Sequence, residues 1–331
     1  MSARARLLAC LVPAVLTGAA CDIAISADGV QGAFDRQLIV SGPLQLEVES
    51  GAGDIVVHTG PVGTVQIKGR VRASTSPFVS FGGQSPAERV RQIEKDPPIE
   101  QMGNRIHVGP KRWNDGWNGI SISYEITVPA HTQLAARSGS GDLEVGDVTG
   151  PVDTSTGSGD IRVGRVAESV KARSGSGEIA VDGAASIEAS TGSGNVVAAS
   201  VRGDLEARSG SGDITVGQKG KGHVDVSTGS GDVEVTGAAG PVHVRASSGD
   251  ILVEGTPVAD WEVSASSGDV RLRLAGQSGF DLDLRSNSGR IETSHPITVT
   301  GSQSRRELKG QVRGGGPRVH ATTSSGAILI Q

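Results

Sequence analysis

Aromatic side chains make up only 2% of this 331-residue chain, which holds just two cysteines. With so few large rings, any hydrophobic core has to be thin and aliphatic. Cys10 lies in the N-terminal segment described next, so the remainder of the chain has one cysteine and no internal disulfide. No later apolar run approaches the ~20 residues of a membrane-spanning helix. A basic stripe with interleaved aromatic residues is also missing, which excludes nucleic acid as an expected partner.

The first twenty residues have the pattern of an export signal. Arg4 and Arg6 precede the apolar run 7–16, and small residues follow this run. We therefore predict a signal peptide over 1–20 and an exported protein.

Cys21 follows the small residues directly and resembles the lipidated cysteine of a bacterial lipoprotein. The resemblance implies a lipid-anchored protein of the cell envelope, periplasmic or on the surface, with a linker over 21–37. Gly18 departs from the lipoprotein pattern, which prefers Leu, Ile or Val at that position. Plain secretion with an unmodified thiol at Cys21 is the alternative.

A short motif returns about every eighteen residues through most of the chain. It first appears as SGAGDIVV at 50–57 and then in full copies from SGSGDLEV at 138–145 to TGSGDVEV at 228–235. Shorter forms such as SSGDILV (247–253) and SSGAILI (324–330) follow. A fixed period of this kind is typical of a stacked repeat architecture.

Within each repeat, aliphatic residues recur at about nine positions and usually have a second small or apolar residue two positions later. Ile161 with Val163 and Val170 with Ala172 are examples. Spacing of i and i+2 is that of a strand with one buried face, and the glycine pairs exclude helix. We predict an all-β fold, a parallel β-solenoid with ~18-residue rungs of two short strands each. Glycine is expected at the corners because tight turns need backbone angles that side chains block.

A second period is superimposed on the first. The residue before the corner alternates between arginine and serine: Arg137, Ser155, Arg173, Ser190, Arg208 and Ser227. Either neighbouring rungs interleave bulky and small side chains, or one full turn holds thirty-six residues. The first reading is favoured because a four-sided turn needs more corner signals.

The predicted solenoid domain covers 38–331 and contains one partly helical insertion, 74–119. Within the insertion, 85–96 predicts a short helix and 104–109 a strand. The solenoid is expected to resume at 120–129, and the C-terminal 27 residues are expected to close its open end.

The aspartates that follow the corner glycines are the obvious candidate site. They are Asp142, Asp160, Asp213, Asp232, Asp250 and Asp269. Stacked carboxylates repel, which suggests either a calcium ladder or turn aspartates that accept backbone N–H groups. The second reading is favoured because the same position holds Asn195, Glu178, Arg290 and Ala327. The GGxGxD pattern of calcium-binding rolls is also absent.

Tryptophan offers the other candidates. Trp113 and Trp117 lie in a polar loop and are candidate partner contacts, with packing over the solenoid end as the favoured alternative. Trp261 occupies an inward position of the strand series, which predicts a core residue. The histidines lack zinc spacing, and the serine clusters are all turns, so no catalytic residue, metal site or cofactor is predicted.

The region 38–331 resembles the bacterial putative-adhesin family, a domain of unknown function with SGSGDI repeats. More distantly it resembles the head-GIN autotransporter-adhesin domains. The resemblance is carried by YEITVPAHTQLAARSGSGDLEV (124–145), by the iterated corner motif and by GGGPRVHATTSSGAILI (314–330). It implies an envelope-associated β-solenoid, often membrane-anchored, and carries no catalytic residues.

These observations together predict a non-enzymatic protein that serves as a structural or interaction surface in adhesion or envelope stress. Its partner would be an envelope protein or a glycan. A calcium- or glycan-binding module is the alternative function. A polysaccharide-active β-helix enzyme is the third, and the scarcity of aromatic residues speaks against it.

Overall fold

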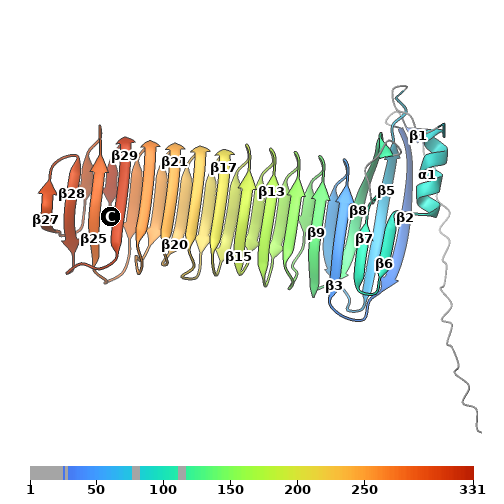
Figure 1. Cartoon of the computed structure of the whole chain (residues 1–331), viewed down its shortest axis with the longest axis horizontal. Helices are drawn as coiled ribbons and strands as arrows, with labels where there is room; N and C mark the ends of the chain where they lie inside the picture. The colour runs from blue at the N-terminus through green and yellow to red at the C-terminus, as the bar shows by residue number, and fades with distance from the viewer. Residues whose placement is uncertain (1–24, 27–28, 77–82, 111–116) are drawn as a thin grey trace, which may run out of the picture.

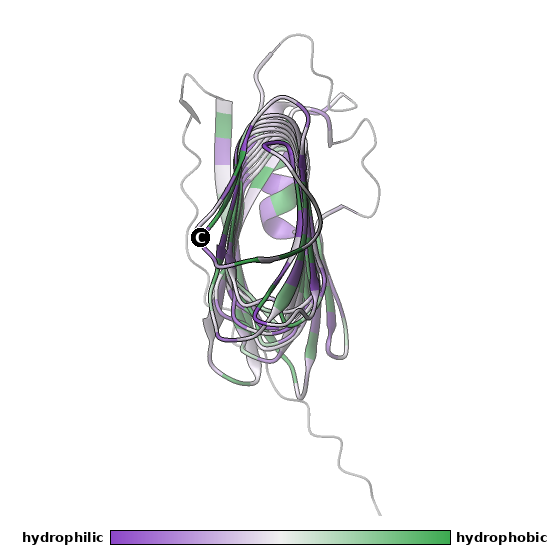
Figure 2. Ribbon diagram, turned by 90° about the vertical axis from the view of Figure 1, so that its left-hand side faces the viewer, coloured by the Kyte–Doolittle hydropathy of each residue, from purple (hydrophilic) through white to green (hydrophobic). Residues whose placement is uncertain are grey.

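The computed structural model describes residues 25–26, 29–76, 83–110 and 117–331. In this part of the chain two 15-stranded sheets face each other and form a long, flattened tube (Figures 1 and 2). The all-β, predominantly parallel solenoid predicted from the repeat is confirmed.

Sheet A runs along one side of the tube. Its strands, in spatial order, are β1 (Ile25–Ser26), β2 (Gly29–Ile39), β5 (Thr64–Ala73), β8 (Ile120–Pro129), β4 (Ile55–Gly60), β10 (Leu143–Val145), β12 (Ile161–Arg165), β14 (Ile179–Gly183), β16 (Val196–Val201), β18 (Ile214–Gln218), β20 (Val233–Ala238), β22 (Ile251–Gly255), β24 (Val270–Leu274), β30 (Ile328–Ile330) and β26 (Ile291–Thr293).

Sheet B forms the opposite side. Its strands, from the opposite end of the rod, are β27 (Thr298–Gln303), β28 (Glu307–Val312), β25 (Phe280–Ser286), β29 (Arg318–Ser325), β23 (Trp261–Ser267), β21 (Val242–Ser248), β19 (Val224–Ser230), β17 (Leu205–Ser211), β15 (Ser186–Thr191), β13 (Ser169–Ser174), β11 (Val152–Thr156), β9 (Thr132–Ser138), β3 (Leu44–Ser50), β7 (Arg105–Val108) and β6 (Ile99–Met102).

One turn of the solenoid holds about eighteen residues, one strand in each sheet. Ile161 pairs with Ile179, and Val152 pairs with Val170. The thirty-six-residue alternative is therefore wrong. Ser155 lies between Arg137 and Arg173 in neighbouring strands, so bulky and small side chains interleave as the favoured reading predicted.

The core is the thin space between the two sheets. Alternate residues of each strand point into it, as the pattern buried–exposed–buried of β12 and β24 illustrates. Ile161, Ile179 and Val196 stack on one another in this way, each fully buried. Such side chains contribute roughly 1.5–3 kcal/mol each by burial, but only when neighbouring rungs are present to cover them.

The N-terminal end is closed by an antiparallel extension and a helix. β2 pairs with β5, and β5 pairs with β8, both antiparallel. Residues 29–37 therefore belong to the sheet, and the predicted linker over 21–37 is wrong for them, because the β2 side chains Val30 and Phe34 join the core.

The predicted helix in the insertion is confirmed as α1 (Pro86–Lys95). It starts at Ser85 with a capping box in which Ser85 and Glu88 satisfy each other's backbone N–H groups. Its buried residues Val90 and Ile93 face the tube, and the helix packs on β2 and β5. Figure 2 shows it lying behind the oval outline of the rungs, where it covers the end of the core.

Rungs at both ends are stacked out of chain order. The rung β3/β4 lies between the later rungs β7/β8 and β9/β10. At the other end, the final rung β29/β30 is inserted between β23/β24 and β25/β26 (Figure 1). The expectation that the C-terminal segment simply closes the end is wrong for β29 and β30. The closing strands there are β28 and β27, which add antiparallel to β25.

The position of the rung β29/β30 between the rungs β23/β24 and β25/β26 predicts an unusual response to truncation. A chain that ends at Pro317 lacks β29 and β30, so the outermost rung and its two closing strands have nothing to stack on. We expect amides of β25, β26 and β28 to lose protection in hydrogen–deuterium exchange, while the central rungs keep theirs. Leu329→Ala, which changes only the outer face of β30, should leave the pattern unchanged. Retained protection of β25 and β28 in the truncated chain would contradict the arrangement.

Candidate functional site

The first serine or threonine of each SGSG corner is turned inward and buried. The Ser174 hydroxyl donates to the Gly159 carbonyl of the preceding rung at 2.8 Å and accepts the Gly177 N–H at 2.8 Å. The same pair of bonds recurs at Ser138, Thr156 and Thr191. These hydroxyls satisfy corner backbone groups that the sheets cannot reach, so they are structural and not nucleophilic.

The corner glycines are required by the spacing between rungs. A Cβ on Gly177 would lie 1.9 Å from the Gly159 carbonyl oxygen, and one on Gly159 would lie 2.1 Å from that of Gly141. The predicted reason, a backbone angle closed to other residues, applies to three successive corners of the repeat. There Gly231, Gly249 and Gly268 have φ of +143°, +134° and +142°.

We expect Ser174→Ala to lower the free energy of unfolding by about 1–3 kcal/mol, because it leaves a buried carbonyl and N–H without partners. Ser174→Thr should be tolerated, since threonine occupies this position in alternate rungs. The control is Ser176→Ala in the same corner, where the serine is exposed and a change below about 0.5 kcal/mol is expected. Chemical denaturation followed by circular dichroism measures all three, and equal losses at 174 and 176 would disprove this role.

The aspartates singled out in the sequence form one row along the same edge of the rod. The Asp142 Oδ1 atom accepts the Asp160 N–H at 2.9 Å, and Asp160 Oδ1 accepts the Glu178 N–H at 2.9 Å. The pattern continues to Ala327, whose N–H binds Asp269 Oδ1 at 2.8 Å. Each of these aspartates thus supplies one acceptor to the next rung, which explains why Asn195 serves equally well, accepting the Asp213 N–H at 2.9 Å.

Arginines offset the charge of this row. Arg162 lies 3.0 Å from the Asp160 carboxylate, and Arg271 lies 3.5 Å from Asp250 and 3.6 Å from Asp269. The described residues contain no group of three or more acidic, histidine or cysteine side chains placed to hold a metal ion. The hydrogen bonds to backbone N–H groups and the arginine contacts therefore favour turn aspartates that accept backbone N–H groups over a calcium ladder.

Two changes at Asp160 separate these readings. Asp160→Asn keeps the acceptor and should leave stability unchanged, whereas Asp160→Ala removes one rung-to-rung hydrogen bond and should cost about 0.5–1.5 kcal/mol. Millimolar calcium should not raise the melting temperature of the unaltered chain above its value in chelator. A calcium-dependent rise that Asp160→Asn abolishes would restore the calcium ladder.

The outer face of sheet B carries columns of charge. One column contains Arg137, Arg173, Arg208 and Arg245, separated by serines, and acidic residues stand beside it. Glu188 lies 2.8 Å from Lys171 and 2.7 Å from Arg173, and Asp225 lies 3.5 Å from Arg208. Exposed pairs of this kind add little stability, so the pattern is chiefly a surface property.

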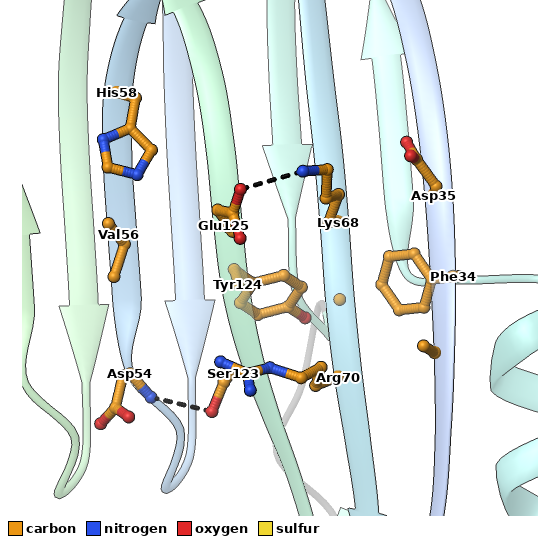
Figure 3. A pocket seen from close by; sticks show the side chains of 12 residues that line it. Phe34, Asp35, Asp54, Val56, His58, Lys68, Arg70, Ser123, Tyr124 and Glu125 are labelled. Atoms are coloured by element: carbon orange, nitrogen blue, oxygen red, sulfur yellow. Dashed lines mark hydrogen bonds and ion pairs between the residues drawn. The ribbon is translucent and has the colours of Figure 1, made fainter.

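The outer face of sheet A has a groove of about 600 Å³ at its N-terminal end. It lies over β2, β5, β8 and β4, with Lys68, Arg70 and Glu125 among its lining residues (Figure 3). Lys68 Nζ donates to Glu125 Oε1 at 3.0 Å. This hydrogen bond lowers the pKa of Glu125 and raises the pKa of Lys68. The contribution of the pair is thus present above the usual glutamate range and is lost as the pH falls through the lowered pKa.

The floor of the groove is backbone, and its aromatic residues lie beneath it. Phe34 and Tyr124 point into the core, with ring centroids 6.5 Å apart, and a Cβ on Gly69 would meet the Phe34 ring. Burial raises the pKa of the Tyr124 hydroxyl. The sequence reading missed this groove. The available signal was the outward-pointing series Lys68, Arg70 and Arg72 of one strand.

The tryptophans have different surroundings. Trp261 is fully buried and donates its Nε1–H to the Gly240 carbonyl at 3.1 Å, which confirms the core assignment. Trp117 is half-buried against the core, and the Arg89 guanidinium carbon of α1 lies 5.1 Å from its ring centroid.

Trp113 and Cys21 lie outside the described residues, so their predicted roles stay predictions. No helix among the described residues is long and apolar enough to cross a membrane.

The fold and these surfaces define a β-solenoid of two broad outer faces joined by polar corners. The family model Toastrack DUF4097 matches residues 88–223 and 168–331. The chain therefore belongs to the Toastrack DUF4097 family, which confirms the predicted membership of a family of unknown function. No curated protein matches the chain.

Similar solved structures are distant. A "putative cell adhesion protein" from Clostridium sporogenes has 13% identity and a TM-score of 0.19, with 90% of this chain and 98% of that chain covered. A "putative lipid binding protein" from Parabacteroides distasonis has 12% identity and a TM-score of 0.40, with 90% and 96% covered. A "putative adhesin" from Bacteroides fragilis has 10% identity and a TM-score of 0.30, with 90% and 97% covered. Similarity at this level carries no argument about function.

Proposed function

We propose that this protein is an exported, non-enzymatic interaction module of the cell envelope, adhesin-like in the sense that it presents a rigid surface to a partner. One observation carries the proposal. The polar groups that recur most often in the chain, the corner hydroxyls and aspartates, are used up in holding rung to rung. What remains available to a partner is the pair of outer faces, which repeat at the rung spacing.

The same observation speaks against catalysis by these residues. The hydroxyl hydrogen of Ser174 is donated to a backbone carbonyl, which is not a general base that could activate the serine as a nucleophile. The aspartates of the row are exposed or half-buried along one edge of the rod.

Attachment to the envelope is proposed through lipid on Cys21. The export pattern of 1–20 supports this, as does the position of Cys21 after the small residues. The predicted anchor precedes β2, so the lipid would be joined to the end of the rod that α1 covers.

Replacement of the cysteine tests the anchor. We expect the full chain, expressed in a bacterial host, to take up labelled palmitate and to sediment with membranes. Cys21→Ser should abolish both, whereas Cys10→Ser, in the expected signal peptide, should retain both. If the unaltered chain is exported but unlabelled and soluble, the lipid anchor is excluded and plain secretion remains.

A further inference from the structure

We propose that the groove on sheet A binds an acidic oligosaccharide, with a uronate carboxylate held by Arg70. The inference deepens the proposed function by naming a ligand class for one surface. It rests only on the rod being an interaction module and not on the lipid anchor.

The groove is bounded by two rows of side chains that run along the rod. Strand pairing aligns Asp35, Lys68, Glu125 and Val56 in one row. It aligns Ala33, Arg70 and Ser123 in the other, which Asp54 extends through its N–H, donated to Ser123 Oγ at 3.3 Å. The rows are two residues apart, roughly 7 Å, and cross four strands, roughly 14 Å. The residues between them, Phe34, Gly69 and Tyr124, leave the outer floor uncovered. A short, extended chain of a few sugar rings fits this shape.

Arg70 provides the anion contact. No hydrogen bond or ion pair links its guanidinium to any residue in the described part of the chain, whereas neighbouring Lys68 is bound to Glu125 at 3.0 Å. Figure 3 shows the Arg70 side chain crossing β8 beside Ser123, away from Lys68. After the Lys68 contact, the charge of Arg70 also helps to lower the pKa of Glu125, but its exposed guanidinium has no direct hydrogen bond or ion pair among the described residues and offers a planar fork suited to a carboxylate.

The rest of the groove favours hydroxyl groups over a peptide. β5, β8 and β4, which carry most of the groove, are each paired on both edges, so these three strands have no main-chain group free for the strand addition by which sheets commonly bind peptides. Recognition has to use side chains. Asp35, Asp54 and Glu125 accept hydrogen bonds, and Ser123 and His58 complete the polar lining.

The acidic residues also limit the charge of the ligand. Asp35, Glu125 and Asp54 would repel a dense polyanion such as a nucleic acid or polyphosphate. A sugar unit with one carboxylate among several hydroxyls matches the mixture of one unpaired cation and several acceptors. Because the aromatic rings lie under the floor, no ring is available for stacking on a sugar, and the affinity should be modest.

Calorimetric titration of the full chain with trigalacturonate tests the site. The control ligand is the methyl ester of trigalacturonate, which has nearly the same shape but no charge. We expect saturable binding of the acid, weaker binding of the ester, and a decrease in affinity as salt is raised. Absence of binding by trigalacturonate at millimolar concentration, or equal binding of the ester, would overturn the proposal. So would tighter binding of a hexaglutamate peptide, since it would assign the groove to acidic peptides.

Variants of the two neighbouring arginines locate the site. Arg70→Ala should weaken binding of trigalacturonate by about tenfold or more, and Arg70→Lys should restore only part of the loss. Arg72→Ala is the matched control, because Arg72 is exposed two residues further along β5 but outside the groove lining. Equal losses at 70 and 72 would indicate nonspecific attraction and sink the proposal. Palmitate labelling and membrane sedimentation should be unchanged in all three variants, so loss of groove binding leaves the proposed attachment to the envelope standing.

Discussion

Everything in this structure depends on the distance between neighbouring rungs, which the parallel sheets hold near 4.8 Å. At that spacing the backbone of one corner lies directly on the carbonyl oxygens of the corner before it. Only glycine leaves room there, as Gly177 over Gly159 illustrates. The carbonyls and N–H groups that meet in the corner then need polar partners, which the buried hydroxyls and the aspartate row supply.

The same constraint divides the chain into parts with different freedom. Corner positions mostly hold glycine, serine or threonine and a hydrogen-bond acceptor, and inward positions mostly hold aliphatic residues, with Trp261 as an aromatic exception. In the part of the chain that the structure describes, outward side chains of the strands face solvent and are not covered by another layer of the protein. Sheet B can therefore carry arginine and glutamate columns while sheet A carries small residues such as Ala180 and Val197, with the same rung beneath. A surface of this kind can change its partner without changing its fold.

The periodic part of the fold could be predicted from the sequence because every rung repeats the same local rules. Strand positions, the eighteen-residue turn, the helix before Pro97 and the inward Trp261 all follow from short-range patterns. The end rungs could not be predicted in this way. Pairing of β29 with both β23 and β25 joins segments far apart in the chain, and β2 in the expected linker is stabilised by β5, whose paired residues lie 25 to 43 positions later. The groove was missed for the same reason, since its lining comes from four strands brought together by those long-range pairings.

The placement of the last strand has a consequence for how the protein is made. Ile328 and Ile330 of β30 are fully buried in a rung that supports another rung outside it. During synthesis and export the distal end of the rod cannot close until these residues have emerged, although the central rungs can already be stacked. A chain that stops before β29 is left with an unsealed core and open strand edges. The presence of the rung β29/β30 therefore decides whether the distal end of the rod can close.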